Sequence, residues 1–297
     1  MLRWRLIAAA CIIFPLLFII WLDDQHNFGR PGIYLIPVAI VVSQMACAEL
    51  CELFKAKSIP LRCKTFHLAT LMPPLFAAVP CIWNAQFAST PLVNLGWLAA
   101  GVTVGFGLIA VIEIIRYHEP GENLIRLASG TFVVCYAGLL MGFFVELRLL
   151  APGRKGLAAV IGTILIVKLS DAGAYFVGRA FGKNKLFPVL SPGKTWEGVL
   201  GGLGVAIAGS AFFFFLLLPM LGVQRNVNYQ SWVWITYAMS LTVVGIFGDL
   251  FESLLKRDAK IKDSSHWMPG LGGVLDVIDS MVAVAPLSFA WWASGWI

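Results

Sequence analysis

The feature that most constrains this chain is a series of long apolar stretches separated by short polar connections. A helix needs about 20 residues to cross the hydrocarbon core of a bilayer, and the mean hydropathy of +0.82 lies far above that of a soluble domain. The first stretch lacks a signal-peptide cleavage pattern before Asp23, so we interpret it as a retained helix. The sequence predicts an all-α fold, a polytopic integral membrane helical bundle of about nine transmembrane helices, near residues 5–22, 31–51, 66–84, 94–115, 127–147, 156–178, 199–221, 231–254 and 272–296.

The distribution of lysine and arginine predicts the orientation of the chain. With the N-terminus inside, the inner segments hold 16 of these residues and the outer segments 5, although Arg148, Arg154 and Lys155 oppose the bias. Cytoplasmic loops carry such an excess, so we expect the loops 179–198 and 255–272 on the cytoplasmic side of the inner membrane. Topology and attraction to anionic lipid then explain the net charge of +6, and we expect no nucleic-acid partner.

Polar residues enter the spans themselves only in the second half of the chain. We therefore expect an N-terminal region of about five spans, residues 1–150, and a C-terminal catalytic region of about four spans, residues 151–297. Lys168 and Asp171 lie three residues apart, on one face of the sixth span. A pair facing a cavity in the bundle is tolerable in a membrane. A functional role and simple mutual neutralisation both fit this pair.

The polar segment between the sixth and seventh spans is Ser191-Pro-Gly-Lys194-Thr195-Trp196-Glu197-Gly198. Its Gly-Lys-Thr resembles part of a nucleotide-binding P-loop, but that motif needs a glycine where Pro188 stands. What remains is a turn that presents a cation and two hydroxyls at the start of a helix, which suits a phosphate. Trp196 fits stacking on a base and anchoring at the membrane interface equally well.

A second polar cluster lies at the junction of the last two spans. Asp249 ends one helix, and Asp276 and Asp279 begin the next, three residues apart. Three converging carboxylates can hold one or two Mg²⁺ ions, which prefer oxygen ligands. Salt-bridged acids in a positive-inside loop are the alternative, which does not explain acids at the membrane ends of both helices. The bases available to phosphate oxygens are Lys256, Arg257 and Lys262.

Three motifs, in the correct order, resemble the CDP-diacylglycerol synthase family, also called phosphatidate cytidylyltransferases. They cover roughly residues 165–285. The motifs are Asp171-x-Gly-Ala-Tyr-Phe-x-Gly-Arg179, then Ser191-Pro-x-Lys-Thr-Trp-Glu-Gly198, and finally Ser253-x-x-Lys256-Arg257, Lys262-Asp263, Pro269-Gly-Leu-Gly-Gly273 and Asp276-x-x-Asp279.

The resemblance implies transfer of the cytidylyl group of CTP to phosphatidate, which gives CDP-diacylglycerol and pyrophosphate for phospholipid biosynthesis. It implies Mg²⁺ at two cation sites, with Asp171, Asp249, Asp276 and Asp279 as ligands. The implied catalytic residues are Asp249, Lys256, Arg257, Lys262, Asp263 and Asp276. The implied substrate-binding residues are Ser191, Lys194, Thr195, Trp196, Glu197, Ser253, Gly272 and Gly273. Small-residue helix faces also allow a homodimer.

The chain departs from the family pattern at two positions. Leu271 stands where the family has histidine, and Val277 where it has arginine. Because every carboxylate is retained, we expect metal binding to survive and favour a divergent subgroup with the same chemistry over an inactive enzyme.

Three alternative functions are compatible with parts of the sequence. A CTP-dependent lipid kinase of the polyprenol or phytol type would release CDP and no pyrophosphate. A non-catalytic paralogue would bind lipid or nucleotide without turnover. An ion or lipid transporter would spread its acids along a pore, whereas here they cluster beside a basic loop.

Overall fold

The computed structural model describes residues 2–59, 61–83, 91–150, 154–224, 232–261, 264–265 and 272–297. Among these, seven helices are long and apolar enough to cross a membrane, namely Leu35–Ala56, Val93–Ile115, Asn123–Arg148, Lys155–Phe181, Trp196–Met220, Val233–Asp258 and Val274–Ala293. The prediction of a polytopic helical membrane protein is therefore confirmed.

The expected number of nine spans is not confirmed. The two spans expected near 5–22 and 66–84 coincide with α1 (Leu2–Gln25), α3 (Cys63–Ala77) and α4 (Val79–Ile82), which are not among the seven. With 15 residues, α3 is shorter than the roughly 20 that a bilayer core requires.

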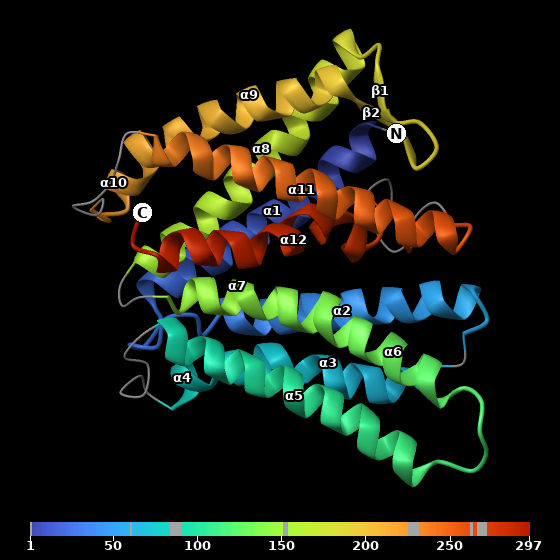
Figure 1. Cartoon of the computed structure of the whole chain (residues 1–297). Helices are drawn as coiled ribbons and strands as arrows, with labels where there is room; N and C mark the ends of the chain where they lie inside the picture. The colour runs from blue at the N-terminus through green and yellow to red at the C-terminus, as the bar shows by residue number, and fades with distance from the viewer. Residues whose placement is uncertain are drawn as a thin grey trace. The chain divides into compact units, whose positions relative to one another are not determined.

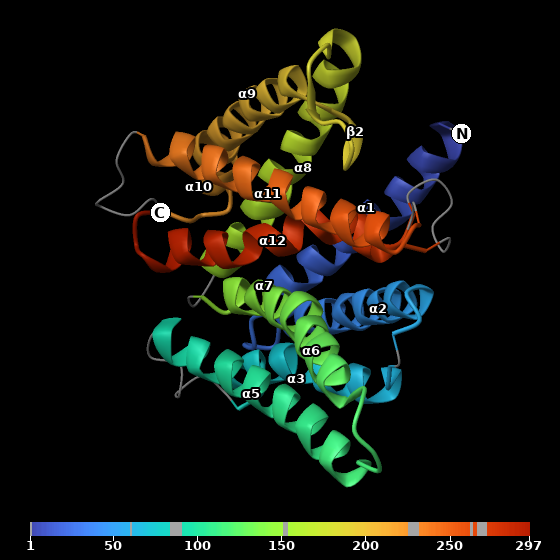
Figure 2. The same cartoon turned by 45° about the vertical axis from the view of Figure 1, so that its right-hand side comes forward.

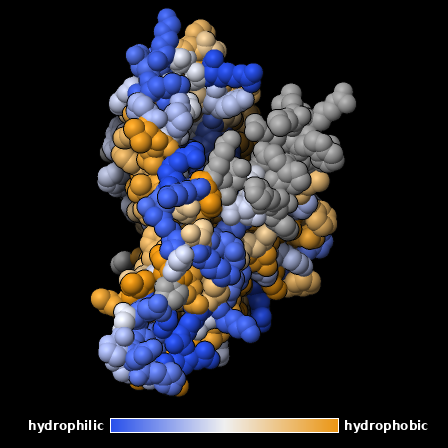
Figure 3. Space-filling view, turned by 90° about the vertical axis from the view of Figure 1, so that its right-hand side faces the viewer, coloured by the Kyte–Doolittle hydropathy of each residue, from blue (hydrophilic) through white to orange (hydrophobic). Residues whose placement is uncertain are grey.

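The surface of the helices carries many large apolar side chains. Phe14, Ile114 and Leu200 are 71%, 74% and 67% exposed. Such side chains are suited to contact with lipid. Figure 3 shows one face of the molecule, on which hydrophilic side chains (blue) are frequent and apolar ones (orange) are interspersed.

The chain divides into two compact units, which we describe separately. The first comprises residues 1–149 and 258–278. Its helices are α1, α2 (Leu35–Ala56), α3, α4, α5 (Pro91–Ile115), α6 (Asn123–Val133), the π-helical turn η1 (Val134–Leu139) and α7 (Leu140–Arg148).

Within the first unit, α3 packs against α2 and α5 (Figure 2). The backbones of α3 and α5 approach closely at Gly101, where a Cβ atom would lie 2.7 Å from the carbonyl oxygen of Met72. Small residues at such contacts are typical of helix packing in membranes, where apolar burial alone does not drive association.

A buried ion pair fixes the turn between α1 and α2. Arg148, at the end of α7, is 2% exposed, and its Nε lies 2.5 Å from Oδ2 of the fully buried Asp23. Asp23 also accepts hydrogen bonds from the backbone amides of Gly32 and Tyr34, at 3.2 and 3.1 Å. Arg148 is one of the bases that oppose the orientation bias, and its neutralisation by Asp23 explains why it is tolerated there.

The second unit comprises residues 150–257 and 279–297. It holds α8 (Lys155–Phe181), the strands β1 (Lys185–Phe187) and β2 (Ser191–Thr195), α9 (Trp196–Phe212), the π-helical turn η2 (Phe213–Leu217), α10 (Leu218–Met220), α11 (Val233–Asp258) and most of α12 (Val274–Ala293). The two strands form an antiparallel hairpin between α8 and α9, and these two helices pack along each other (Figure 1).

A buried hydroxyl network joins α8, α11 and α12. Ser288 Oγ lies 2.6 Å from Thr163 Oγ1 and 2.8 Å from Tyr237 OH. Trp292 Nε1 donates to the same tyrosine oxygen at 3.2 Å. Because each hydroxyl finds a partner, these polar groups can be buried without a large desolvation cost, and they hold together the helices that carry the candidate site.

Candidate functional site

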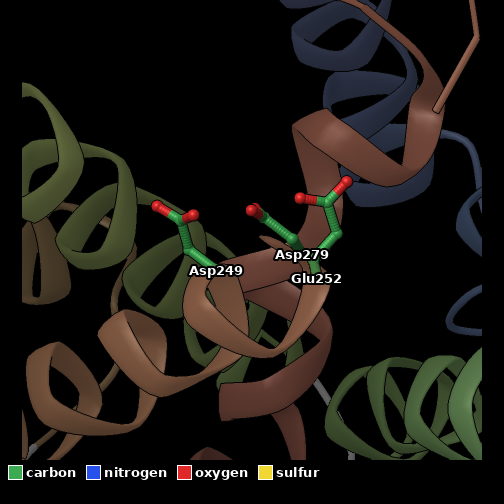
Figure 4. A group of neighbouring side chains, drawn as sticks. All are labelled: Asp249, Glu252 and Asp279. Carbon is green, nitrogen blue, oxygen red and sulfur yellow. The ribbon is translucent and has the colours of Figure 1, made fainter. Parts of the chain in front are cut away.

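Three carboxylates gather where α11 and α12 meet in the second unit. Asp249 and Glu252 lie one turn apart on α11, and Asp279 lies on α12 (Figure 4). One oxygen atom from each lies within 4.8 Å of the others, and both Glu252 and Asp279 are buried. Negative charges this close repel one another unless a cation neutralises them. Among the described residues this is the one group of three or more carboxylate, imidazole or thiol side chains close enough to share a metal ion.

Gly248 brings the two helices together at the cluster. A Cβ atom at this position would lie 2.6 Å from Cβ of Ala283 and 2.7 Å from the carbonyl oxygen of Asp279. Only glycine fits such a contact, so the residue before Asp249 determines how near α11 lies to Asp279.

Two lysines of the second unit neutralise part of the cluster. Lys194, on β2, places its Nζ 2.9 Å from Oδ2 of Asp249 and donates to the carbonyl oxygen of Ile246 at 3.3 Å. Lys256, one turn after Glu252, lies 2.7 Å from Oε2 of that residue. The predicted substrate-binding lysine of the hairpin and a predicted catalytic lysine of α11 thus both contact the carboxylates.

The pair predicted within the sixth span also lies beside the cluster. Lys168 Nζ is 3.3 Å from Oδ2 of Asp171, as the spacing predicted, and the same oxygen accepts a hydrogen bond from Ser280 Oγ at 3.0 Å. Ser280 follows Asp279 on α12. These contacts join α8 to the site, and the predicted role of Asp171 as a metal ligand stays a prediction.

Other residues of the hairpin motif build the hairpin itself. The side chain of Thr195 caps α9 by accepting a hydrogen bond from the amide of Gly198 at 3.1 Å. Glu197 accepts from the amides of Lys183 and Asn184, each at 3.2 Å, and from the side-chain amide of Asn184 at 2.7 Å. Ser191 is half-buried and Trp196 is exposed. The motif therefore shapes the turn that presents Lys194.

Replacing Thr195 with valine should destabilise the protein by about 1 kcal/mol, because valine keeps the shape of threonine but removes the helix cap. Serine retains the hydroxyl and should cost less. Thermal unfolding of the purified protein in detergent measures both effects. A valine variant at least as stable as the serine variant would contradict the capping role.

Asp276 makes its described contacts within the first unit. Its Oδ2 accepts hydrogen bonds from the amide of Gly273 at 2.7 Å and from the hydroxyl and amide of Ser264 at 2.8 and 3.1 Å. Gly272 and Gly273 thus lie at the capped start of α12. The role of Asp276 as a metal ligand stays a prediction, and so does the role of the two glycines in substrate binding.

The remaining predicted residues lie on or after the last turns of α11. Ser253 is half-buried one turn from Asp249, and Arg257 is exposed. Lys262, Asp263 and Leu271 lie outside the described residues. Glu252 was not predicted as a ligand, although its spacing of three residues from Asp249 was a signal for it.

Comparison with known proteins gives consistent matches. The model of the cytidylyltransferase family matches residues 3–294. A phosphatidate cytidylyltransferase of Staphylococcus aureus (strain COL) is 39% identical over 264 residues, 87% of this chain and 89% of that protein. That of Bacillus subtilis (strain 168) is 30% identical over 258 residues, 86% and 88% of the two chains. That of Haemophilus influenzae is 44% identical over 131 residues, 44% of each chain. These matches confirm the resemblance, and the chain belongs to the cytidylyltransferase family.

Proposed function

We propose that the protein transfers the cytidylyl group of CTP to phosphatidate, giving CDP-diacylglycerol and pyrophosphate for phospholipid biosynthesis. The family membership and the names of the relatives support this reaction. The observation that carries the proposal is the carboxylate cluster of Asp249, Glu252 and Asp279, flanked by Lys194 and Lys256, in a membrane protein.

The reaction needs no covalent enzyme intermediate. A phosphate oxygen of phosphatidate attacks the α-phosphorus of CTP in line and forms the new P–O bond. The bond from that phosphorus to the oxygen bridging to the β-phosphate breaks, and pyrophosphate leaves with the electron pair. Positioning of the two phosphates and neutralisation of their charge therefore supply most of the acceleration.

The cluster fits Mg²⁺, because its donors are carboxylate oxygens close enough to share one ion. Asp249, Glu252 and Asp279 would hold it, and Asp171 and Asp276 are each kept in the proposal as further cation ligands. When bound, Mg²⁺ supplies positive charge that offsets the charge of the phosphates.

The bases of the site have separate tasks in this proposal. Lys194 pairs with Asp249. From its place near the end of the hairpin, the ammonium group of Lys194 also contacts a phosphate of the substrate. Lys256 pairs with Glu252, and Arg257, at the end of α11, binds phosphate oxygens, together with Lys262. Ser191, Trp196 and Ser253 line the nucleotide side.

The loop charges support a location for the site. The N-terminus lies on the cytoplasmic side of the inner membrane, and the site opens to the cytoplasm, where CTP is available. Phosphatidate enters laterally from the inner leaflet. We also propose that the protein forms a homodimer, in which helix faces rich in small residues pack against each other.

The fate of a label in CTP tests the reaction. The purified, detergent-solubilised protein receives phosphatidate, Mg²⁺ and CTP labelled at either the α- or the γ-phosphorus. We expect the α-label in the lipid product and the γ-label in pyrophosphate. Transfer of the γ-label to lipid with release of CDP would show a lipid kinase, and absence of both transfers would indicate a non-catalytic paralogue.

A further inference from the structure

The start of α12 is held by a carboxylate from a distant part of the first unit. Glu49, on α2, is 8% exposed and precedes Val274 by 225 positions. Its Oε1 accepts a hydrogen bond from the amide of Val274, and its Oε2 accepts one from the amide of Leu275, both at 2.8 Å. Val274 and Leu275 are the first two residues of α12.

Glu49 performs the task of a helix cap. The first amides of a helix lack partners within the helix, and a side chain just before it usually satisfies them. Here the preceding residue is Gly273, where a Cβ atom would overlap Ser264 Oγ and the carboxylate of Glu49. The distant carboxylate occupies that space and also places a negative charge at the positive end of the helix dipole.

Ser264 connects this cap to Asp276. Its hydroxyl oxygen lies 2.8 Å from Oε2 of Glu49 and 2.8 Å from Oδ2 of Asp276. A hydroxyl has one proton, so it donates to one of the two carboxylates at a time. The amide of Ser264 donates to Asp276 as well, at 3.1 Å. Glu49, Ser264 and Asp276 therefore form one assembly, and α12 reaches Asp279 one turn later.

We propose that Glu49 is a positioning residue for the reaction, because it fixes the start of α12 and with it the orientation of Asp276 and Asp279. The inference rests on the proposed function, since it concerns the two aspartates only as groups that serve the transfer. Glu49 lies outside the three motifs of the second half of the chain, so it gives the N-terminal region a part in arranging the site.

Glu52 provides a matched control. It lies one turn after Glu49 on α2, and both line a pocket of about 340 Å³ together with Met45, Ala48, Ser264 and Ser265. Its described ion pair is with Lys55, at 2.7 Å, and its side chain is 66% exposed. Glu52→Gln thus removes the same charge from the same helix and pocket without removing a hydrogen bond to α12.

Glu49→Gln preserves the size of the side chain but replaces one acceptor oxygen with an amide that donates. Hydrogen–deuterium exchange of residues 272–278, measured without substrate or metal, should become faster in this variant and stay unchanged in Glu52→Gln. The turnover number should fall about 10- to 100-fold, and the Mg²⁺ concentration for half-maximal activity should rise. Glu52→Gln should match the wild type in turnover number and in the Mg²⁺ concentration for half-maximal activity.

Ser264→Ala separates positioning from capping, and it also serves if Glu49→Gln does not fold. Alanine leaves both amide contacts of Glu49 in place and keeps the backbone amide that donates to Asp276, but it removes the hydroxyl that joins Glu49 to Asp276. In Ser264→Ala, we expect the amides of Val274 and Leu275 to exchange more slowly than in Glu49→Gln. We also expect the Mg²⁺ concentration for half-maximal activity to be higher than in the wild type.

The outcomes separate the two proposals. Faster exchange in Glu49→Gln with wild-type turnover and Mg²⁺ requirement would reduce Glu49 to a structural cap and overturn its positioning role. Wild-type exchange in that variant would overturn the cap itself. If the wild type shows no cytidylyl transfer, the proposed function fails and the positioning role with it, whereas the exchange result still decides the cap.

Discussion

Replacing Asp249 with asparagine should reduce pyrophosphate release about a thousandfold, because a charged ligand to a catalytic cation contributes several kcal/mol and each 1.4 kcal/mol is about tenfold in rate. Asparagine keeps the size of the side chain but removes the charge that pairs with Lys194. The measurement is the initial rate of pyrophosphate release from CTP by the purified protein with phosphatidate and Mg²⁺.

Asp258 offers a control on the same helix. Its carboxylate is 70% exposed and pairs with Lys57 at 2.9 Å. Asp258→Asn removes an equal charge and should leave turnover unchanged, since exposed pairs contribute little. Wild-type turnover in Asp249→Asn, or equal losses in both variants, would refute the role of the cluster.

Gly248→Ala should lower the turnover number about a hundredfold, the loss that a displacement of about 1 Å can cause. The added methyl group would meet Ala283 at 2.6 Å and the carbonyl oxygen of Asp279 at 2.7 Å, so α11 and α12 must separate beside the cluster. Steady-state kinetics of pyrophosphate release, at saturating CTP and phosphatidate, measure the effect.

Gly245 lies one turn earlier on α11 and is the matched control. A Cβ atom there would be 3.7 Å from its nearest neighbours in Ser280 and Val284, an ordinary contact. Gly245→Ala should therefore retain activity. Adding Ala283→Gly to Gly248→Ala should restore part of the lost turnover, because it removes the contact between the new methyl group and Cβ of Ala283. Equal activity of the two alanine variants would contradict the close approach at Gly248.

The sequence predicted the features that depend on local pattern. The spacing of Lys168 and Asp171 predicted their contact, and seven of the nine apolar stretches predicted as spans coincide with helices of sufficient length. Asp249 and Asp279 were expected at one helix junction, where the structure brings them together. In each case a short-range period or a motif determines which side chains share a face.

Features that depend on distant contacts were not predicted. Nothing local to Glu49 indicates that it binds amides 225 positions later. The approach of α11 to α12 adds Asp279 to the pair of Asp249 and Glu252 on α11. Ser264 likewise bonds Asp276, 12 positions later in the chain. The length of α3 was overestimated because hydropathy alone does not mark where a helix ends.

Binding of Mn²⁺ is the measurement that tests the central claim most directly, namely that Asp249, Glu252 and Asp279 form a divalent-cation site. Electron paramagnetic resonance distinguishes free from bound Mn²⁺ in the purified protein and does not require turnover. The wild type and Asp258→Asn should bind the ion, and Asp249→Asn should bind it much more weakly. Equal binding by all three proteins would show that the cation is held elsewhere.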